Sequence, residues 1–129
     1  MFLALKANVT LTELNLEGNC MRVTGAKMLA EFLGQSGLQN LRLLDISDND
    51  ISSYGDDFSA VHSLANSLRV NSTLRGLHLA RNNIEETCVE AFAEAMRDNA
   101  TLCDLVLLSE EEAIAVHNEA GLKIIAKRT

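Results

Sequence analysis

The chain has 129 residues, of which 47% are hydrophobic and 22% charged, so it is long and apolar enough for one domain with a real core. Its formal net charge of −7 argues against a nucleic-acid or anionic-membrane surface, since both require a basic footprint. No run approaches the roughly 18 apolar residues of a membrane span, and three cysteines, an odd number, suit reduced thiols in a cytoplasmic protein.

Residues 1–10 look like the end of a helix and the turn that follows it. The spacing Leu-x-x-Asn-x-Thr-Leu that ends at Leu11 recurs with its last leucine at Leu74 and, with Met96 in the place of the first leucine, at Leu102. No strand precedes this first helix end, so residues 1–10 are expected to form a partial repeat. Either the chain is a fragment of a longer array, or this apolar end docks on another chain, in which case we expect self-association through it.

From Leu11 onward a template, L-x-x-L-x-L-x-x-N, recurs along the chain. The alternation in L-x-L is the period of a short strand, and asparagine suits the turn that follows because its amide both donates and accepts hydrogen bonds. The template positions are Leu11, Leu14, Leu16 and Asn19; Leu41, Leu44, Ile46 and Asn49; Leu74, Leu77, Leu79 and Asn82; and Leu102, Leu105 and Leu107, with Glu110 in the place of the asparagine. The template predicts repeats over 11–40, 41–73 and 74–101, and an atypical last repeat from 102.

After each predicted strand the period changes to that of an amphipathic helix, with apolar residues at i, i+3, i+4 and i+7. The three stripes are Ala26, Leu29, Ala30 and Leu33; Val61, Leu64, Ala65 and Leu68; and Val89, Phe92, Ala93 and Met96. A small residue opens each helix, so that helix and sheet approach closely. We match Gly25, Gly55 and Cys88 at this position.

The second repeat is longer than the third, and its extra residues fall near Ser53–Ala60. Either the helix is longer there or a polar loop bulges from the rim. Insertions in repeat proteins gather on one face and often on the binding face, so this segment is a second candidate for function.

The chain is expected to close with a cap helix that runs to Arg128. Ser109, followed by three glutamates, forms a plausible capping box, and acidic residues suit a helix N-terminus. Ile114 and Ile125 would lie on the inner side of this helix, and Lys127 near its C-terminal dipole.

The repeat resembles the leucine-rich repeat, and its length resembles the ribonuclease-inhibitor-like subtype. The resemblance implies an α/β solenoid: a short right-handed β-α horseshoe arc with a parallel sheet on the concave face and helices on the convex face. The whole chain, 1–129, is then expected to be a single domain, with residues 102–129 as its atypical last repeat and C-terminal cap.

In such a repeat the residues between the strand leucines point away from the core and line the concave face. The positions expected to bind a partner are Glu13, Asn15, Glu17, Asp45, Asp48, His78, Arg81, Val106 and Leu108. The surface runs from acidic, through His78 and Arg81, to apolar. This gradient favours a protein partner that offers basic and apolar contacts.

No catalytic, cofactor or metal site is expected. The acidic stretch Asp48–Asp50 lacks the glycine and distal glutamate of an EF-hand, and no two histidines share zinc-ligand spacing with a cysteine. There is no nucleophile elbow and no phosphate-binding loop. Three Asn-x-Thr sequons, at Asn8, Asn71 and Asn99, share one repeat position, the turn from helix into strand, which favours a structural role over glycosylation.

These observations favour a non-enzymatic protein–protein interaction module, a scaffold that binds through its concave face or rim. The same repeat also serves GTPase-activating proteins of the RanGAP type, for which Arg81 is the only basic residue in the corresponding loop. Two further alternatives are a leucine-rich repeat sensor fragment of a nucleotide-binding immune receptor and an actin-capping, tropomodulin-like region. The resemblance is specific for the fold, and this fold hosts many different functions.

Overall fold

Strands and helices alternate along the chain in the computed structural model. It describes residues 10–35 and 39–107, together with the backbone of 113–117 and 123–127. The elements are β1 (Glu13–Asn15), α2 (Arg22–Gly34), β2 (Leu43–Asp45), α3 (Ser59–Leu68), β3 (Gly76–His78), α4 (Glu86–Met96), β4 (Asp104–Val106), β5 (Ala113–His117) and β6 (Lys123–Lys127).

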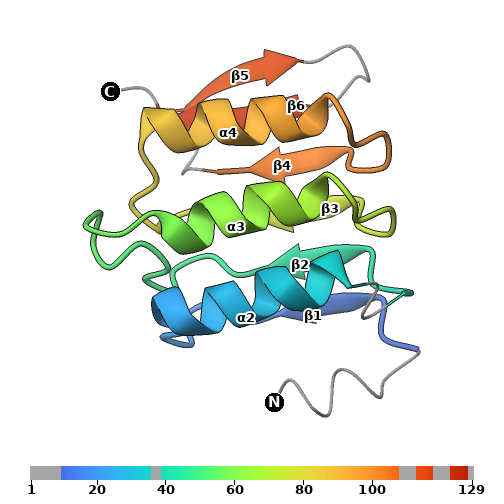
Figure 1. Cartoon of the computed structure of the whole chain (residues 1–129), viewed down its shortest axis with the longest axis horizontal. Helices are drawn as coiled ribbons and strands as arrows, with labels where there is room; N and C mark the ends of the chain where they lie inside the picture. Colours follow the sequence, from blue (N-terminus) through green and yellow to red (C-terminus); the bar gives the residue numbers. More distant parts are fainter. Residues whose placement is uncertain (1–9, 36–38, 108–112, 118–122, 128–129) are drawn as a thin grey trace.

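The strands form one sheet in the order β1-β2-β3-β4-β6-β5. Strands β1 to β4 and β6 are parallel, and β5 joins the far edge antiparallel to β6. The three helices lie side by side on one face of this sheet, and no described element covers the other face (Figure 1). The parallel sheet with helices on one side, expected from the resemblance, is confirmed.

The core lies between the sheet and the helices and consists of the predicted repeat positions. In the second and third repeats the strand leucines and isoleucine are wholly buried: Leu41, Leu44, Ile46, Leu74, Leu77 and Leu79. The stripes of α2 and α3 are buried throughout; in α4, Phe92 and Met96 are buried while Val89 and Ala93 are partly covered. In the first repeat Leu11, Leu14 and Leu16 are only partly buried, because β1 is the edge strand.

A ladder of buried asparagines joins consecutive repeats where the strands end. The Asn49 side chain donates to the carbonyls of Leu16 (2.9 Å) and Ile46 (3.0 Å), and its oxygen accepts from the backbone N–H of Asn19 (3.1 Å). Asn82 repeats this one step along: it donates to the Ile46 carbonyl (3.0 Å) and accepts from the Asn49 N–H (2.9 Å). Each side chain therefore satisfies the backbone of two neighbouring turns.

The sequon asparagines form a second ladder at the opposite edge, where the helices lead into strands. Asn71 and Asn99 are both buried. The side-chain nitrogen of Asn99 donates to the carbonyls of Leu68 (2.7 Å) and Asn71 (3.0 Å). The side-chain nitrogen of Asn71 donates to the Leu33 carbonyl (3.2 Å). A glycan attached to either nitrogen would have to displace these bonds, which supports the structural interpretation; Asn8 lies outside the described residues.

The expected C-terminal cap helix is wrong for the described part of that segment. Residues 113–117 and 123–127 form β5 and β6, and β6 pairs with β4 in the register Leu105↔Ile124. Both segments are short and contain β-branched isoleucine or valine, which favours strands. The free edge of β4 offers unpaired backbone groups that a strand satisfies and a helix would leave open. The capping box at 109–112 lies outside the described residues.

The extra residues of the second repeat form a loop and do not lengthen the helix, since α3 begins only at Ser59. Gly55 lies within this loop at φ +91°, so its match to Gly25 is wrong. Counting back from the buried helix residues places Ala60 at the position of Gly25 and Cys88. A Cβ at Gly25 would lie 2.6 Å from the side chain of Met21, which explains the glycine there.

Among the helices of the described ranges, none combines the length and the apolar character that a bilayer crossing requires.

The three thiols are expected to differ sharply in reactivity. Burial raises the pKa of the Cys88 thiol above its ordinary value, and its side chain is wholly covered, whereas Cys20 and Cys103 are exposed. Because the thiolate is the reactive form, a water-soluble disulfide reagent at pH 8 should modify two thiols quickly and Cys88 only after denaturation. Equal rates for all three cysteines in the folded protein would contradict this expectation.

Candidate functional site

The face of the sheet away from the helices is the candidate site. Its rows follow from the strand register, which aligns Glu13, Leu43, Gly76 and Asp104 in one row and Asn15, Asp45, His78 and Val106 in the next. These are the concave positions that the template predicts. Parallel sheets are usually covered on both faces, so an uncovered face with polar side chains is a distinctive feature of this molecule.

Two carboxylates flank His78 near the middle of this face. Its Nε2 lies 2.9 Å from Asp104 Oδ2, and its Nδ1 lies 3.9 Å from Asp45 Oδ2. The Asp45 side chain also accepts a hydrogen bond from the Ser47 N–H (2.9 Å), which fixes its orientation. The three side chains therefore form one connected polar cluster across β2, β3 and β4.

Arg81 forms an ion pair with Glu17, which lies two repeats away along the sheet. The backbone of Arg81 is left-handed (φ +58°), as it is at the matching positions Gly18 and Asp48. Both side chains of the pair are about half exposed, so the pair contributes little to stability, about 1 kcal/mol or less. Its effect is to hold the guanidinium against the first repeat.

The structure brings most of the predicted site residues to this face. Glu13, Asn15 and Asp48 are exposed, and the Asn15 side chain accepts from the Glu17 N–H (2.9 Å). Val106 is half-buried, and Leu108 lies outside the described residues. The predicted set omitted Asp104, although it occupies a concave position by the same counting.

Leu43 and Gly76 make the same face uneven. A Cβ on Gly76 would come within 2.7 Å of the tip of the Leu43 side chain, so this leucine lies across the glycine on the uncovered face. The absence of a side chain at Gly76 thus leaves room for an apolar contact between β2 and β3. From the sequence, this contact could have been suggested only by comparing the residues at this position in neighbouring repeats.

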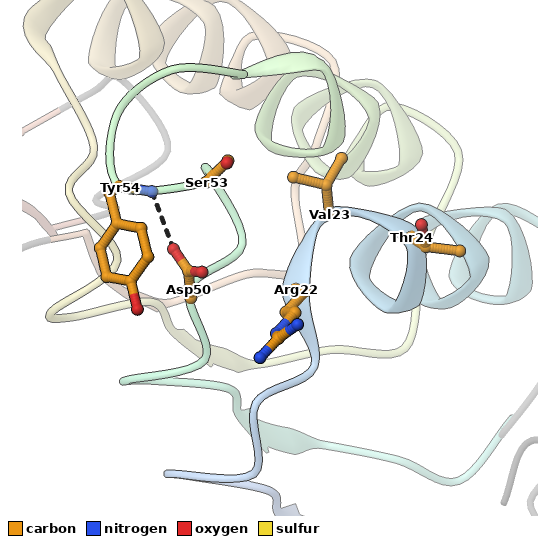
Figure 2. A pocket seen from close by; sticks show the side chains of 6 residues that line it. All are labelled: Arg22, Val23, Thr24, Asp50, Ser53 and Tyr54. Carbon is orange, nitrogen blue, oxygen red and sulfur yellow. Dashed lines mark hydrogen bonds between the residues drawn. The ribbon is translucent and has the colours of Figure 1, made fainter.

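A second feature lies at the edge where strands lead into helices. A pocket of about 390 Å³ opens between the start of α2 and the loop that follows β2 (Figure 2). Its lining residues are Arg22, Val23, Thr24, Asp50, Ser53 and Tyr54. The loop belongs to the insertion that the sequence marks as a second candidate for function.

The acidic side chains of the described residues do not converge on a metal site. No group of three or more His, Cys, Asp or Glu side chains within these ranges is placed to hold an ion. Asp50 and Asp57 are instead used locally: Asp50 accepts from the Tyr54 N–H (2.8 Å), and Asp57 from the N–H (2.9 Å) and hydroxyl (2.6 Å) of Ser59. These hydrogen bonds from Ser59 lower the pKa of Asp57.

Comparison with known proteins agrees with this architecture. The chain is 34% identical over 104 residues to human NACHT, LRR and PYD domains-containing protein 13; the match covers 81% of this chain and only 9% of that protein. The solved structure of leiomodin-1 actin-binding site 2 superposes with a TM-score of 0.68 at 20% identity, covering 81% of this chain and 57% of that one. The family model described as Leucine Rich repeat matches residues 7–30, 37–55 and 70–93, more than half of the chain. The chain belongs to the leucine-rich repeat family.

Proposed function

We propose that this chain is a non-enzymatic interaction module that binds a protein partner through the uncovered face of its sheet. The observation that supports this most is the group formed by Asp45, His78 and Asp104, whose polar side chains are held in place on a face that no described element covers. A surface whose side chains are already ordered loses little conformational entropy when it binds.

The charges of this face favour a partner with basic groups. Glu13, Glu17, Asp45 and Asp104 lie on it, and the Arg81–Glu17 pair neutralises only one of them. At the β4 side the half-buried Val106 offers an apolar contact. Opposite charges across an interface mainly set specificity and association rate, so binding should weaken with salt.

Affinity capture from a native extract tests the proposal with a variant that removes three charges of this face, Asp45→Asn, Asp48→Asn and Arg81→Gln. Asparagine at Asp45 keeps the oxygen that accepts from the Ser47 N–H, so the fold is preserved. A matched control, Glu90→Gln and Glu94→Gln, alters exposed residues of α4. We expect a partner held by the wild type and the control and lost by the face variant. Retention by all three would overturn binding through this face.

A second candidate rests on the likeness to the NACHT-containing protein: the chain would serve as the leucine-rich repeat sensor segment of a nucleotide-binding receptor. The test is binding in trans between this chain and the NACHT domain of that human protein. Binding lost in the face variant would favour this candidate, and no binding would remove its support. The free, exposed thiols of Cys20 and Cys103 support a reducing, cytoplasmic location.

The GTPase-activating alternative needs an arginine that can reach a partner's active site. Arg81 is the basic residue at that loop position in the described repeats, and its guanidinium is paired with Glu17. We therefore propose no such activity. Single-turnover hydrolysis by small GTPases should be unchanged by the chain; a stimulation that Arg81→Gln abolishes would reinstate this alternative.

We also propose weak self-association at the β1 end, because Leu11, Leu14 and Leu16 are incompletely covered there. Sedimentation velocity over a range of concentrations tests it. A single monomer peak at the highest concentration would contradict it.

A further inference from the structure

The pocket between α2 and the loop after β2 lies apart from the sheet face and takes no part in the function proposed above. Its walls come from the start of α2 and from the loop that precedes α3, and Figure 2 shows Asp50 and Ser53 of the loop on the side that faces Arg22 and Val23, with the Tyr54 ring farther out. The insertion that builds it occurs in the second repeat, since in the third repeat α4 starts directly after Glu85. The pocket is therefore a local addition to the repeat.

The loop holds an exposed aromatic side chain on a backbone that hydrogen bonds keep in place. Tyr54 is 81% exposed, although its backbone N–H is bound to Asp50. The loop is braced from beneath by Ser52, which is buried: its hydroxyl donates to the Asn82 carbonyl (2.6 Å) and accepts from the Gly55 N–H (3.1 Å). Exposed tyrosines on ordered segments are frequent anchors of protein interfaces, because the backbone that carries them loses little entropy when they are covered.

The opposite wall carries a cation that no described residue neutralises. Arg22 is exposed and makes no ion pair with any residue in the described ranges. Helix α2, which Arg22 begins, has no side-chain cap and no acidic residue in its first turn, whereas α4 has Glu86 there. Asp50 also lines the pocket, but one of its oxygens is engaged by the Tyr54 N–H. Among the described residues the Arg22 guanidinium is thus left without an ion-pair partner, although the Asp50 carboxylate shares the pocket.

We propose that this pocket docks an acidic segment of a protein partner. A carboxylate of the segment pairs with Arg22, and a neighbouring apolar or aromatic side chain packs on the exposed Tyr54 ring. Arginine binds carboxylates through two parallel hydrogen bonds, and an aromatic ring beside it adds contact area without a second charge. The module would then bind basic groups of a partner on its sheet face and acidic groups of a partner at its rim.

The test is an NMR titration of the ¹⁵N-labelled full chain with two short probes. One is a capped tripeptide of glutamate, phenylalanine and glutamate; the other has lysine in place of both glutamates. We expect the acidic probe to shift the backbone amide signals of Thr24 and Tyr54 in a saturable way, and the lysine probe to leave them in place.

Two substitutions then give the sign of the charge that the pocket selects. Arg22→Gln should weaken binding of the acidic probe by about tenfold, the equivalent of one charge-assisted hydrogen bond. Asp50→Asn keeps the acceptor for the Tyr54 N–H and removes a repulsive charge, so it should strengthen binding. Arg97→Gln, at an exposed arginine after α4, is the matched control and should change nothing.

The amide spectrum of each variant also shows that it has folded, so a loss of binding cannot be mistaken for unfolding. Tighter binding of the lysine probe, equal binding by Arg22→Gln and the wild type, or shifts confined to the sheet face around Asp45 and His78 would each overturn the proposal. So would a titration in which neither probe moves any signal of the pocket.

Discussion

Replacing Asn82 by alanine is expected to lower the free energy of unfolding by about 3–5 kcal/mol, enough to remove a large part of a typical domain's stability. The side chain of Asn82 is wholly buried and bonds the Asn49 N–H (2.9 Å) and the carbonyls of Ile46 and Leu79 (3.0 Å each). Alanine leaves the buried Asn49 N–H and the Leu79 carbonyl without these partners, while the Ile46 carbonyl keeps only its bond from the Asn49 side chain (3.0 Å).

The matched control is Asn19→Ala, at the same template position in the first repeat. Asn19 is exposed, and its side chain donates only to the nearby carbonyls of Leu16 and Glu17. Its loss should reduce stability by about 1 kcal/mol or less, because water can replace these bonds. Urea denaturation followed by far-UV circular dichroism compares the two variants. Equal losses would show that burial of the asparagine is not what stabilises the ladder.

Phe92→Ala is the second large effect that we expect, with a loss of about 3–5 kcal/mol. Phe92 is the largest fully buried side chain of the described residues and fills the place that Leu29 and Leu64 occupy in the preceding helices. Its truncation would remove a whole ring from the layer between α4 and the sheet. The same denaturation measurement gives the difference.

Phe58→Ala provides a comparison with identical chemistry and less burial. Phe58 precedes α3 and is only partly buried against the core, so its truncation can be filled by solvent. We expect a clearly smaller loss than at Phe92. If the two losses match, the end of the core around α4 is looser than its complete burial implies.

The register of strands β1 to β4 could be predicted from the sequence. Leu14, Leu44, Leu77 and Leu105 hold the same template position, and they are paired in the sheet as that position requires. Burial of one face leaves no freedom to slip, since a shift by one residue would turn every leucine to solvent. The buried stripes of α2, α3 and α4 could be predicted for the same reason.

The C-terminal strands and the position of Gly55 could not be predicted in this way. A short apolar run such as that around Ile114 or Ile124 suits both a helix and a strand, and the choice depends on the free edge of β4, which the sequence does not display. Gly55 shares only its residue type with Gly25. The insertion moves it into the loop, and the true counterpart, Ala60, is not a glycine.

The candidate site was predictable as a set of positions but not as a set of contacts. The template places Asp45 and His78 in one row, whereas the closer partner of His78 is Asp104, a diagonal neighbour that depends on side-chain rotamers. The Arg81–Glu17 pair passes over the second repeat, a contact that nearest-neighbour counting does not reach. The rim pocket arises from two segments whose proximity only the folded chain reveals.

The unbroken register of β1 to β4 also sets a spacing that a partner must match. Neighbouring strands lie about 4.8 Å apart, whereas an α-helix laid across them advances about 5.4 Å per turn. Over the three intervals from β1 to β4 the mismatch grows to only about 2 Å, less than the reach of a lysine or arginine side chain. A helix of three to four turns could therefore present one residue to each strand, while a longer array would require it to bend.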